Sequence, residues 1–242
     1  FMQKIAYKTS QGYKHGLNFQ FSNSTDIPRY DRLTDASSTG LKNAEWFYGP
    51  QKRLLGVYSL EKENVFLNTD FKLDAGYQNV EESRHNRNFG NYNLQSRIEK
   101  VAVYSLVANF ETKLKKGNLY YGIENYYDDL KSIAEKTNIK TGIVVPLDTR
   151  YPNGENNMMR NDVYLSYSSK RNEATNFSMG ARAGYATLNS SIANNTILPL
   201  PFTEIKQQNF TYSGNIGLVH NTSENFIVKT NLSSGYRVPN ID

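Results

Sequence analysis

The chain has 242 residues, with 28 Lys and Arg against 23 Asp and Glu, so its formal net charge is +5. Only 38% of the residues are hydrophobic, below the roughly 45–50% of an ordinary globular domain, yet 13% are aromatic. Disordered chains are poor in aromatic residues, so this composition argues against disorder. No stretch approaches the roughly 18 consecutive apolar residues of a transmembrane helix. The absence of Cys excludes disulfides, thiolate metal sites and cysteine nucleophiles.

Apolar and polar residues alternate through most of the chain, which is the pattern of β-strands with two different faces. The clearest run is 65–80, where one apolar face is expected to include Val65, Leu67 and Phe71. In chain order, about nine strands are expected, at 14–21, 51–60, 65–80, 100–111, 119–128, 160–170, 177–185, 210–218 and 226–237.

The expected connections alternate between short and long. Short polar turns are predicted at 61–64, 112–118, 171–176 and 221–225, and long segments at 26–49, 81–98, 132–159 and 191–207. A soluble β-sandwich also alternates apolar and polar residues, so alternation alone does not separate the two architectures. Strands of roughly 11–15 residues, with short turns at one end and long loops at the other, favour an outer-membrane barrel. The 18 Tyr residues fit the aromatic girdles of such a barrel.

Nine strands do not make a complete barrel, because bacterial single-chain barrels have an even number of strands. An open sheet in hydrocarbon would also leave the backbone groups of its edges unsatisfied. The sequence therefore predicts part of a larger all-β, antiparallel, up-and-down transmembrane β-barrel. Residues 1–242 are expected to form one partial β-barrel domain.

Several motifs resemble those of a known family. The likeness is carried by residues 22–34 (SNSTDIPRYDRLT), 44–54 (AEWFYGPQKRL), 121–124 and 149–154, and by the terminal Tyr236, Arg237, Pro239 and Asn240. On these motifs the chain resembles the TonB-dependent outer-membrane receptors, in particular the hemin- and siderophore-receptor-like members from Bacteroidetes-type bacteria. The terminal motif departs from the family pattern at Val238, where Ala is common.

The resemblance implies the middle of a barrel of about 22 strands, whose plug domain and remaining strands lie outside this chain. It implies the outer membrane of a Gram-negative bacterium and TonB-dependent active transport of a scarce ligand, with haem or a ferric siderophore as the cargo. The implied partners are the TonB complex, acting through the missing plug, and lipopolysaccharide or other outer-membrane lipid. It implies no cofactor. A passive porin-like or structural barrel is the alternative function.

Candidate ligand contacts lie in the expected long segments and at the terminal motif. His85, with Arg84 beside it, is the histidine expected on the outer side of the membrane, although a loop histidine is more often solvated than liganded. Trp46 and Tyr48 either stack on a planar ligand or anchor the outer interface. Arg237 is expected to point inward, where it binds an anionic ligand or pairs with a neighbouring carboxylate.

Other kinds of site have little support in the sequence. The basic residues are scattered and no recognition motif accompanies them, so nucleic-acid binding is not expected. Segment 148–162 has oxygen donors without the spacing of a Ca²⁺ loop, and it is expected to be a solvated loop. No nucleophile elbow, phosphate-binding loop or H-E-x-x-H stretch is present, so the chain is expected to be neither an enzyme nor a metal protein.

Overall fold

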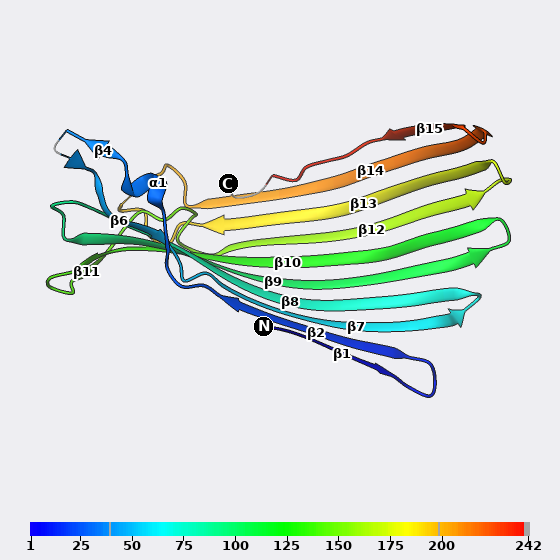
Figure 1. Cartoon of the computed structure of the whole chain (residues 1–242), viewed down its shortest axis with the longest axis horizontal. Coiled ribbons are helices and arrows are strands. Elements are labelled where there is room, and N and C mark those ends of the chain that lie inside the picture. The colour runs from blue at the N-terminus through cyan, green and yellow to red at the C-terminus, as the bar shows by residue number, and fades with distance from the viewer. Residues whose placement is uncertain (39, 198, 240–242) are drawn as a thin grey trace.

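The computed structural model describes residues 1–38, 40–197 and 199–239 of the chain. Ten strands form one continuous antiparallel path in which each strand pairs with its neighbour along the path (Figure 1). They are β1 (Met2–Lys8), β2 (Lys14–Asn23), β7 (Lys52–Phe66), β8 (Thr69–Asn88), β9 (Asn93–Leu114), β10 (Gly117–Asn138), β12 (Asn156–Lys170), β13 (Thr175–Ser191), β14 (Glu204–Ser223) and β15 (Phe226–Ser233). The predicted all-β, up-and-down architecture is confirmed.

Short elements gather at one end of the long strands, on the left of Figure 1. They are β3 (Ile27–Pro28), α1 (Tyr30–Leu33), β4 (Ala36–Ser37), β5 (Gly40–Leu41), β6 (Asn43–Tyr48) and β11 (Val144–Pro146). β6 adds to the far part of β8, and β11 adds to the far part of β10, so both strands extend the sheet beyond the main meander. Within the described residues, no helix is long and apolar enough to cross a membrane.

The expectation of nine strands is wrong by one, because β1 was not predicted. Its seven residues are all exposed, and only Ile5 and Tyr7 give it an apolar alternation. Backbone pairing with β2, from Met2 opposite Gln20 to Lys8 opposite Lys14, forms this strand. The alternating pattern in so short a run was too weak to reveal it.

Three of the four predicted short turns are confirmed, at Lys115–Lys116 between β9 and β10, at 171–174 and at Glu224–Asn225. The turn predicted at 61–64 is wrong, because the chain reverses at Leu67 and Asn68. Both residues have positive φ, at 44° and 58°, as a tight two-residue hairpin requires. Val65 therefore belongs to β7, and Leu67 lies at the tip of the turn, 86% exposed, rather than on a strand face.

The long loop predicted at 81–98 is also wrong. β8 continues to Asn88 and β9 begins at Asn93, so only residues 89–92 connect them. The polar side chains of this stretch gave no alternation, but β6 and β9 supply backbone partners on both sides of β8. The other three long connections are present, although β10 extends into the third as far as Asn138.

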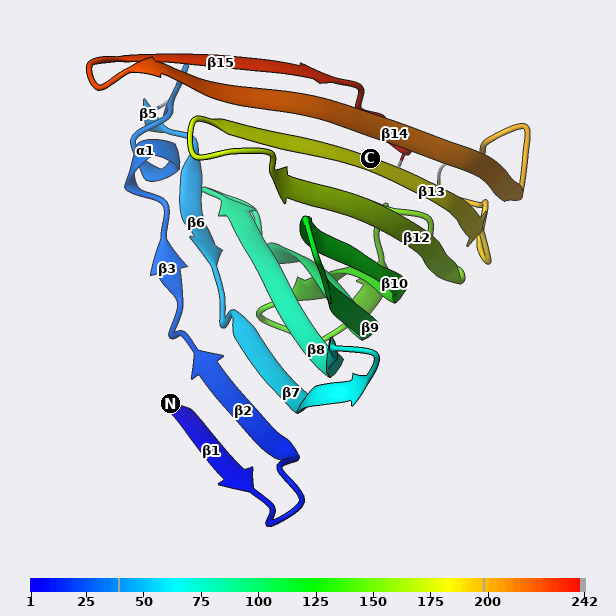
Figure 2. The same cartoon turned by 90° about the vertical axis from the view of Figure 1, so that its right-hand side faces the viewer.

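The sheet curves into a trough, with β1 and β15 at its two free edges (Figure 2). The inner face is identified by a hollow lined by side chains from β8, β9, β10, β12 and β13. Among the described residues, the buried hydrophobic ones are Ala108, Ala134, Ala186 and Leu188. So small a set cannot make the core of a water-soluble domain.

Apolar side chains instead cover the outer face and remain exposed. By strand register this face includes Ile5, Leu17, Phe19, Leu106, Ile123, Val163, Leu165, Ile216, Leu218, Val228 and Leu232. Phe71 and Leu73, on the same face of β8, are partly exposed. The predicted apolar outer face of the sheet is therefore present.

Two rows of aromatic rings cross this outer face. The row nearer the long-loop end, called the upper row, is Tyr77, Tyr104 and Tyr127, with ring centroids 5.1 and 6.2 Å apart between neighbours. The lower row is Phe71, Phe110 and Tyr121, with centroids 5.1 and 5.2 Å apart. On each strand the two rows are six residues apart, or roughly 20 Å at about 3.4 Å per residue. An apolar band between two aromatic girdles is the pattern of a membrane barrel.

The start of β12 is fixed by one buried amide. Asn156 is 1% exposed, and its Nδ2 donates to the backbone oxygens of Pro152 and Leu130 at 2.7 and 3.2 Å. Its Oδ1 accepts a hydrogen bond from Ser190 Oγ at 2.6 Å. The solvated loop expected at 148–162 is therefore wrong from residue 156 onward, where the chain is a strand.

We predict that Asn156→Ala lowers the free energy of unfolding by about 2–3 kcal/mol, because several buried polar groups lose their partner. Asn157→Ala is the matched control, since its side chain lies on the opposite face and accepts one exposed hydrogen bond from Asn189. We expect the control to lose less than about 1 kcal/mol in the same denaturant titration. Equal losses of stability in both variants would contradict the role of the Asn156 side chain in fixing the start of β12.

Candidate functional site

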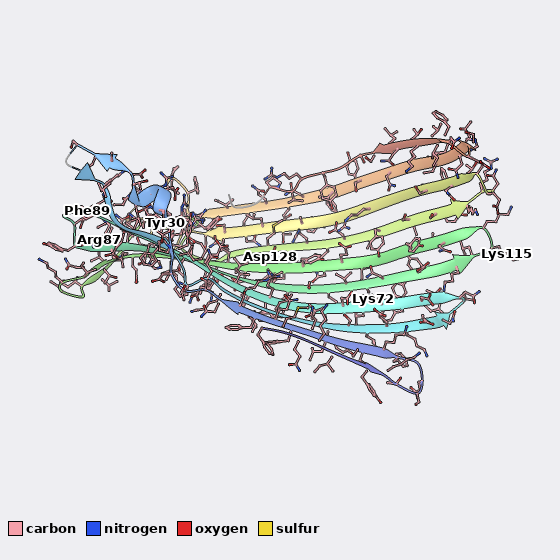
Figure 3. All side chains as sticks on the ribbon, viewed as in Figure 1. Tyr30, Lys72, Arg87, Phe89, Lys115 and Asp128 are labelled. Atoms are coloured by element: carbon pink, nitrogen blue, oxygen red, sulfur yellow. The ribbon has the colours of Figure 1, made fainter. Side chains whose placement is uncertain are left out.

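Polar and charged side chains occupy the inner face of the trough. Figure 3 places Asp128 near the middle of the long strands and Lys72 nearer the short turns, whose tip carries Lys115. Tyr30, Arg87 and Phe89 lie at the opposite end, among the short elements. Of these residues, Asp128 and Lys72 belong to the inner face, where charged side chains occur beside an apolar patch of Val and Leu side chains toward the long-loop end.

A network of charges joins three strands on this inner face. Arg182 Nη2 on β13 lies 2.6 Å from Glu124 Oε2 on β10 and 3.1 Å from Asp162 Oδ2 on β12. A Cβ at Gly184 would lie 2.1 Å from Asp162 Oδ1, so glycine at this position leaves room for the carboxylate. One guanidinium therefore holds two carboxylates that would otherwise repel each other across the strands.

The terminal motif leaves the sheet and lies on this network. β15 ends at Ser233, so the strand expected at 226–237 is wrong over its last four residues. The hydroxyl of Tyr236 donates to Asp162 Oδ1 at 3.0 Å. Arg237 lines an inner-face pocket of about 480 Å³ together with Arg160, which agrees with its predicted inward position. Asn240 lies outside the described residues, and Pro239 is the last residue within them.

At the long-loop end, aromatic rings and guanidinium groups form a second cluster. Tyr48 on β6 lies opposite Arg84 on β8, with the Arg84 guanidinium 5.5 Å from the Tyr48 ring centroid. Trp46 is on the same face of β6 and packs edge-on against Tyr48, with centroids 5.1 Å apart. The guanidinium of Arg29 lies 5.0 Å from the Trp46 ring centroid and 5.2 Å from that of Tyr48. We call Arg29, Trp46, Tyr48 and Arg84 the aromatic–arginine cluster.

Arg29 was not predicted as a site residue, although it falls within the motif at 22–34. It also donates to the Tyr48 hydroxyl and pairs with Asp31, with Nε 2.7 Å from Oδ1. This hydrogen-bonded pairing lowers the pKa of Asp31 to about 2. The position of Arg29 depends on the path of the chain through β3 and α1, which the sequence pattern does not reveal.

Trp46 lies far from the upper aromatic row. It pairs with Asn86, which is nine residues beyond Tyr77 on β8, or roughly 30 Å along the strand. The structure therefore places Trp46 within the aromatic–arginine cluster rather than in the girdle of an outer interface.

His85 lies on the opposite face of β8 from Arg84, because successive side chains of a strand alternate. It is in a strand and not in the expected loop. Its ring stacks on Phe47 of β6, with centroids 4.7 Å apart, and its Nδ1 is 2.9 Å from Ser96 Oγ. Burial lowers the pKa of His85, and the charge of Asp26 opposes this shift in part. His85 thus does not join Trp46, Tyr48 and Arg84, and its role as a ligand contact stays a prediction.

Residues of the described ranges form no group of three or more His, Cys, Asp or Glu side chains that could hold a metal ion. The charged groups of the inner face mostly pair with one another, as Asp128 does with Arg160 at 3.5 Å. The groups on this surface are guanidinium, carboxylate and hydroxyl side chains, which form ion pairs and hydrogen bonds.

The lowered pKa of His85 predicts a local pH dependence. The unfolded chain takes up a proton near the ordinary His pKa of about 6.5, whereas the folded chain resists protonation of the buried His85 ring. The stability that neutral His85 contributes to the folded state is therefore fully present above that pH and is lost as the pH falls below it. We predict that the β6 amides exchange hydrogen faster at about pH 5.5 than at about pH 7.5, after correction for intrinsic rates. His85→Phe should remove this difference, whereas His220→Phe near a short turn should preserve it. A pH dependence that persists in His85→Phe would refute the explanation.

Comparisons with known proteins give structural matches only. No protein-family model matches the chain, and no curated protein sequence matches it. The fold is similar to that of the copper transporter OprC, with a TM-score of 0.77 and 11% identity over 98% of this chain and 36% of the transporter. It is also similar to the ferric citrate transporter FecA in its unliganded form, with a TM-score of 0.63 and 10% identity over 95% of this chain and 34% of that one.

A third match is the ferric yersiniabactin uptake receptor FyuA from Yersinia pestis, with a TM-score of 0.55 and 12% identity over 91% of this chain and 34% of the receptor. The chain spans about a third of the length of each of these proteins. At such low identity the likeness concerns the fold alone. In fold, the chain is an all-β antiparallel meander similar to about a third of the length of each of these transporter chains.

Proposed function

We propose that this chain is part of the barrel of an outer-membrane receptor in a Gram-negative bacterium, which imports a scarce ligand by TonB-dependent active transport. The observation that carries the proposal is the sidedness of the sheet. Its outer face is an apolar band between two aromatic rows, and its inner face carries the network of charged groups around Arg182. The fold of solved transporter barrels, matched over nearly the whole chain, supports the same function.

The proposed domain organisation follows from the two free edges of the trough. Among the residues that the structure describes, β1 pairs with β2 alone and β15 with β14 alone. Unpaired edge groups cost several kcal/mol each in hydrocarbon, so further strands are needed to close the barrel. We infer that residues 1–242 form a partial barrel domain, and that a plug domain elsewhere in the protein connects it to the TonB complex. Outer-membrane lipid, including lipopolysaccharide, would contact the outer face.

For the cargo, we infer haem or a ferric siderophore. The argument rests on the aromatic–arginine cluster at the long-loop end, where rings can stack on a planar ligand and guanidinium groups can bind carboxylates. Arg237, on the inner face, would offer a further positive charge to such a ligand. His85 is not needed for this proposal, because it faces away from the cluster.

A transport assay tests the proposed function. Cells that depend on this protein should lose ligand uptake when TonB is deleted, because the energy for transport would come from the inner membrane. The purified protein should show no large conductance in planar bilayers. Uptake that continues without TonB, together with an open conducting pore, would instead establish the passive porin-like barrel.

The binding part of the proposal predicts different effects for two arginines of β8. Arg84→Ala should weaken the binding of haem or a ferric siderophore by about tenfold, because a charge-assisted contact beside Tyr48 is lost. Arg87→Ala is the matched control, since Arg87 is on the opposite face and pairs with Glu45 at 2.6 Å. The measurement is a titration of the purified full-length protein. If Arg84→Ala binds as tightly as the control, the cluster is not the ligand site.

The membrane part of the proposal predicts different effects for adjacent residues of β9. Leu106→Lys places a charge within the apolar band, which should cost about 2–4 kcal/mol of stability in a bilayer. Val107→Lys points inward, opposite Asp74 and Glu124, and should be tolerated. Unfolding in lipid vesicles gives both values. A larger loss for Val107→Lys than for Leu106→Lys would reverse the assignment of the two faces.

A further inference from the structure

A pocket on the inner face lies beyond the charge network, toward the long-loop end. Its volume is about 410 Å³, within the range of small-molecule sites. Its lining is mostly apolar, with Val80, Val101, Val103, Leu130 and Leu188. The polar lining includes Glu82, Glu99, Asp128 and Arg150.

Glu99 is the unusual residue of this pocket. Its side chain is only 6% exposed, and neither carboxylate oxygen has a hydrogen-bond partner among the described residues. The nearest positive group is Arg150, whose Nη1 is 3.8 Å from Glu99 Oε2, too far for a hydrogen bond. A buried carboxylate without hydrogen bonds is unfavourable, and burial accordingly raises the pKa of Glu99.

The segment that carries Arg150 is fixed on both sides of the pocket. At one side the backbone N–H of Leu147 donates to Ala134 O at 3.0 Å, and Arg97 Nη2 binds Asp148 Oδ1 at 3.1 Å. At the other side the N–H of Gly154 donates to Ser191 O at 3.0 Å. The Arg150 guanidinium lies 5.3 Å from the ring centroid of Tyr151. The backbone is thus held in place, and the arginine stacks beside the pocket without satisfying Glu99.

The other charges around Glu99 leave the pocket acidic. Glu82 adds a second carboxylate, and Asp128 already pairs with Arg160. Arg84 and Arg97 also act on Glu99, but Arg97 is bound to Asp148 and Arg84 lies beside Tyr48. An added positive charge with hydrogen-bond donors is what the buried carboxylate lacks. An ammonium group supplies three such donors on a compact cation.

We propose that this pocket binds an organic cation, with a protonated amine on Glu99 and an apolar body against the valine and leucine side chains. The apolar lining suits such a ligand better than a bare metal ion, which needs several oxygen ligands. The site goes beyond the proposed transport function, because it is separate from the aromatic–arginine cluster and takes the opposite charge. Binding to it requires neither TonB nor a particular cargo.

The test uses phenethylammonium as the probe, titrated calorimetrically into the purified full-length protein. We expect saturable binding of the amine and at least tenfold weaker binding of neutral phenethyl alcohol. Glu99→Gln should weaken amine binding by at least tenfold. Glu111→Gln is the matched control, because it is on the same strand and face but lines a different pocket, and it should leave binding unchanged.

A second variant keeps the proposal falsifiable if Glu99→Gln does not fold. Arg150→Met removes the competing cation and keeps the carboxylate, so it should bind the amine a few-fold more tightly. The proposal is overturned if the amine does not bind saturably, if the alcohol binds as well as the amine, or if Arg150→Met weakens amine binding. Since the titration contains no TonB, its failure would leave the transport proposal untouched, and a failed uptake assay would leave this one untouched.

Discussion

The ladder of backbone hydrogen bonds between consecutive strands is the interaction on which the rest of the structure depends. Each strand between β1 and β15 pairs with a neighbour on both sides, with unbroken pairing as long as Gly117–Asn138 against Asn93–Leu114. Because the neighbouring strands supply the backbone partners of these inner strands, the side chains of one face are free to meet an apolar surrounding and those of the other are free to meet a polar one. The aromatic rows and the inner charge network are two consequences of that single arrangement.

Much of the fold could be predicted from the sequence where alternation was strong. Phe210, Tyr212, Ile216 and Leu218 all lie on the outer face of β14, as their alternation with polar residues predicts. Prediction failed where backbone pairing, and not side-chain pattern, decides the structure. The polar stretch around Arg84 and His85 is a strand because β6 and β9 enclose it. The turn at Leu67 and Asn68 was missed because Leu67, which has positive φ there, is not a typical turn residue and continues the apolar alternation.

The candidate site was predictable only in part, for the same reason. Trp46, Tyr48 and Arg84 could be selected as residue types suited to a ligand, but their meeting depends on the register of β6 on β8. In the same strand β8, His85 lies on the face opposite Arg84 and so points away from these residues. Arg29 and Glu99 were missed, because their importance comes from contacts between distant segments: Arg29 with the rings of β6, and Glu99 with the segment that carries Arg150. Arg29 falls within the motif at 22–34, but nothing in that motif distinguishes it from its neighbours, and no local motif marks Glu99.

The central claim is that the two faces of each strand meet different surroundings. The most direct measurement is the labelling of single cysteines introduced one at a time at residues 102–109 of β9 in the protein reconstituted in lipid, because the natural chain contains no Cys. A water-soluble maleimide should react at positions 103, 105, 107 and 109 and should react poorly at 102, 104, 106 and 108. Labelling without this two-residue period, or with the opposite phase, would contradict the account.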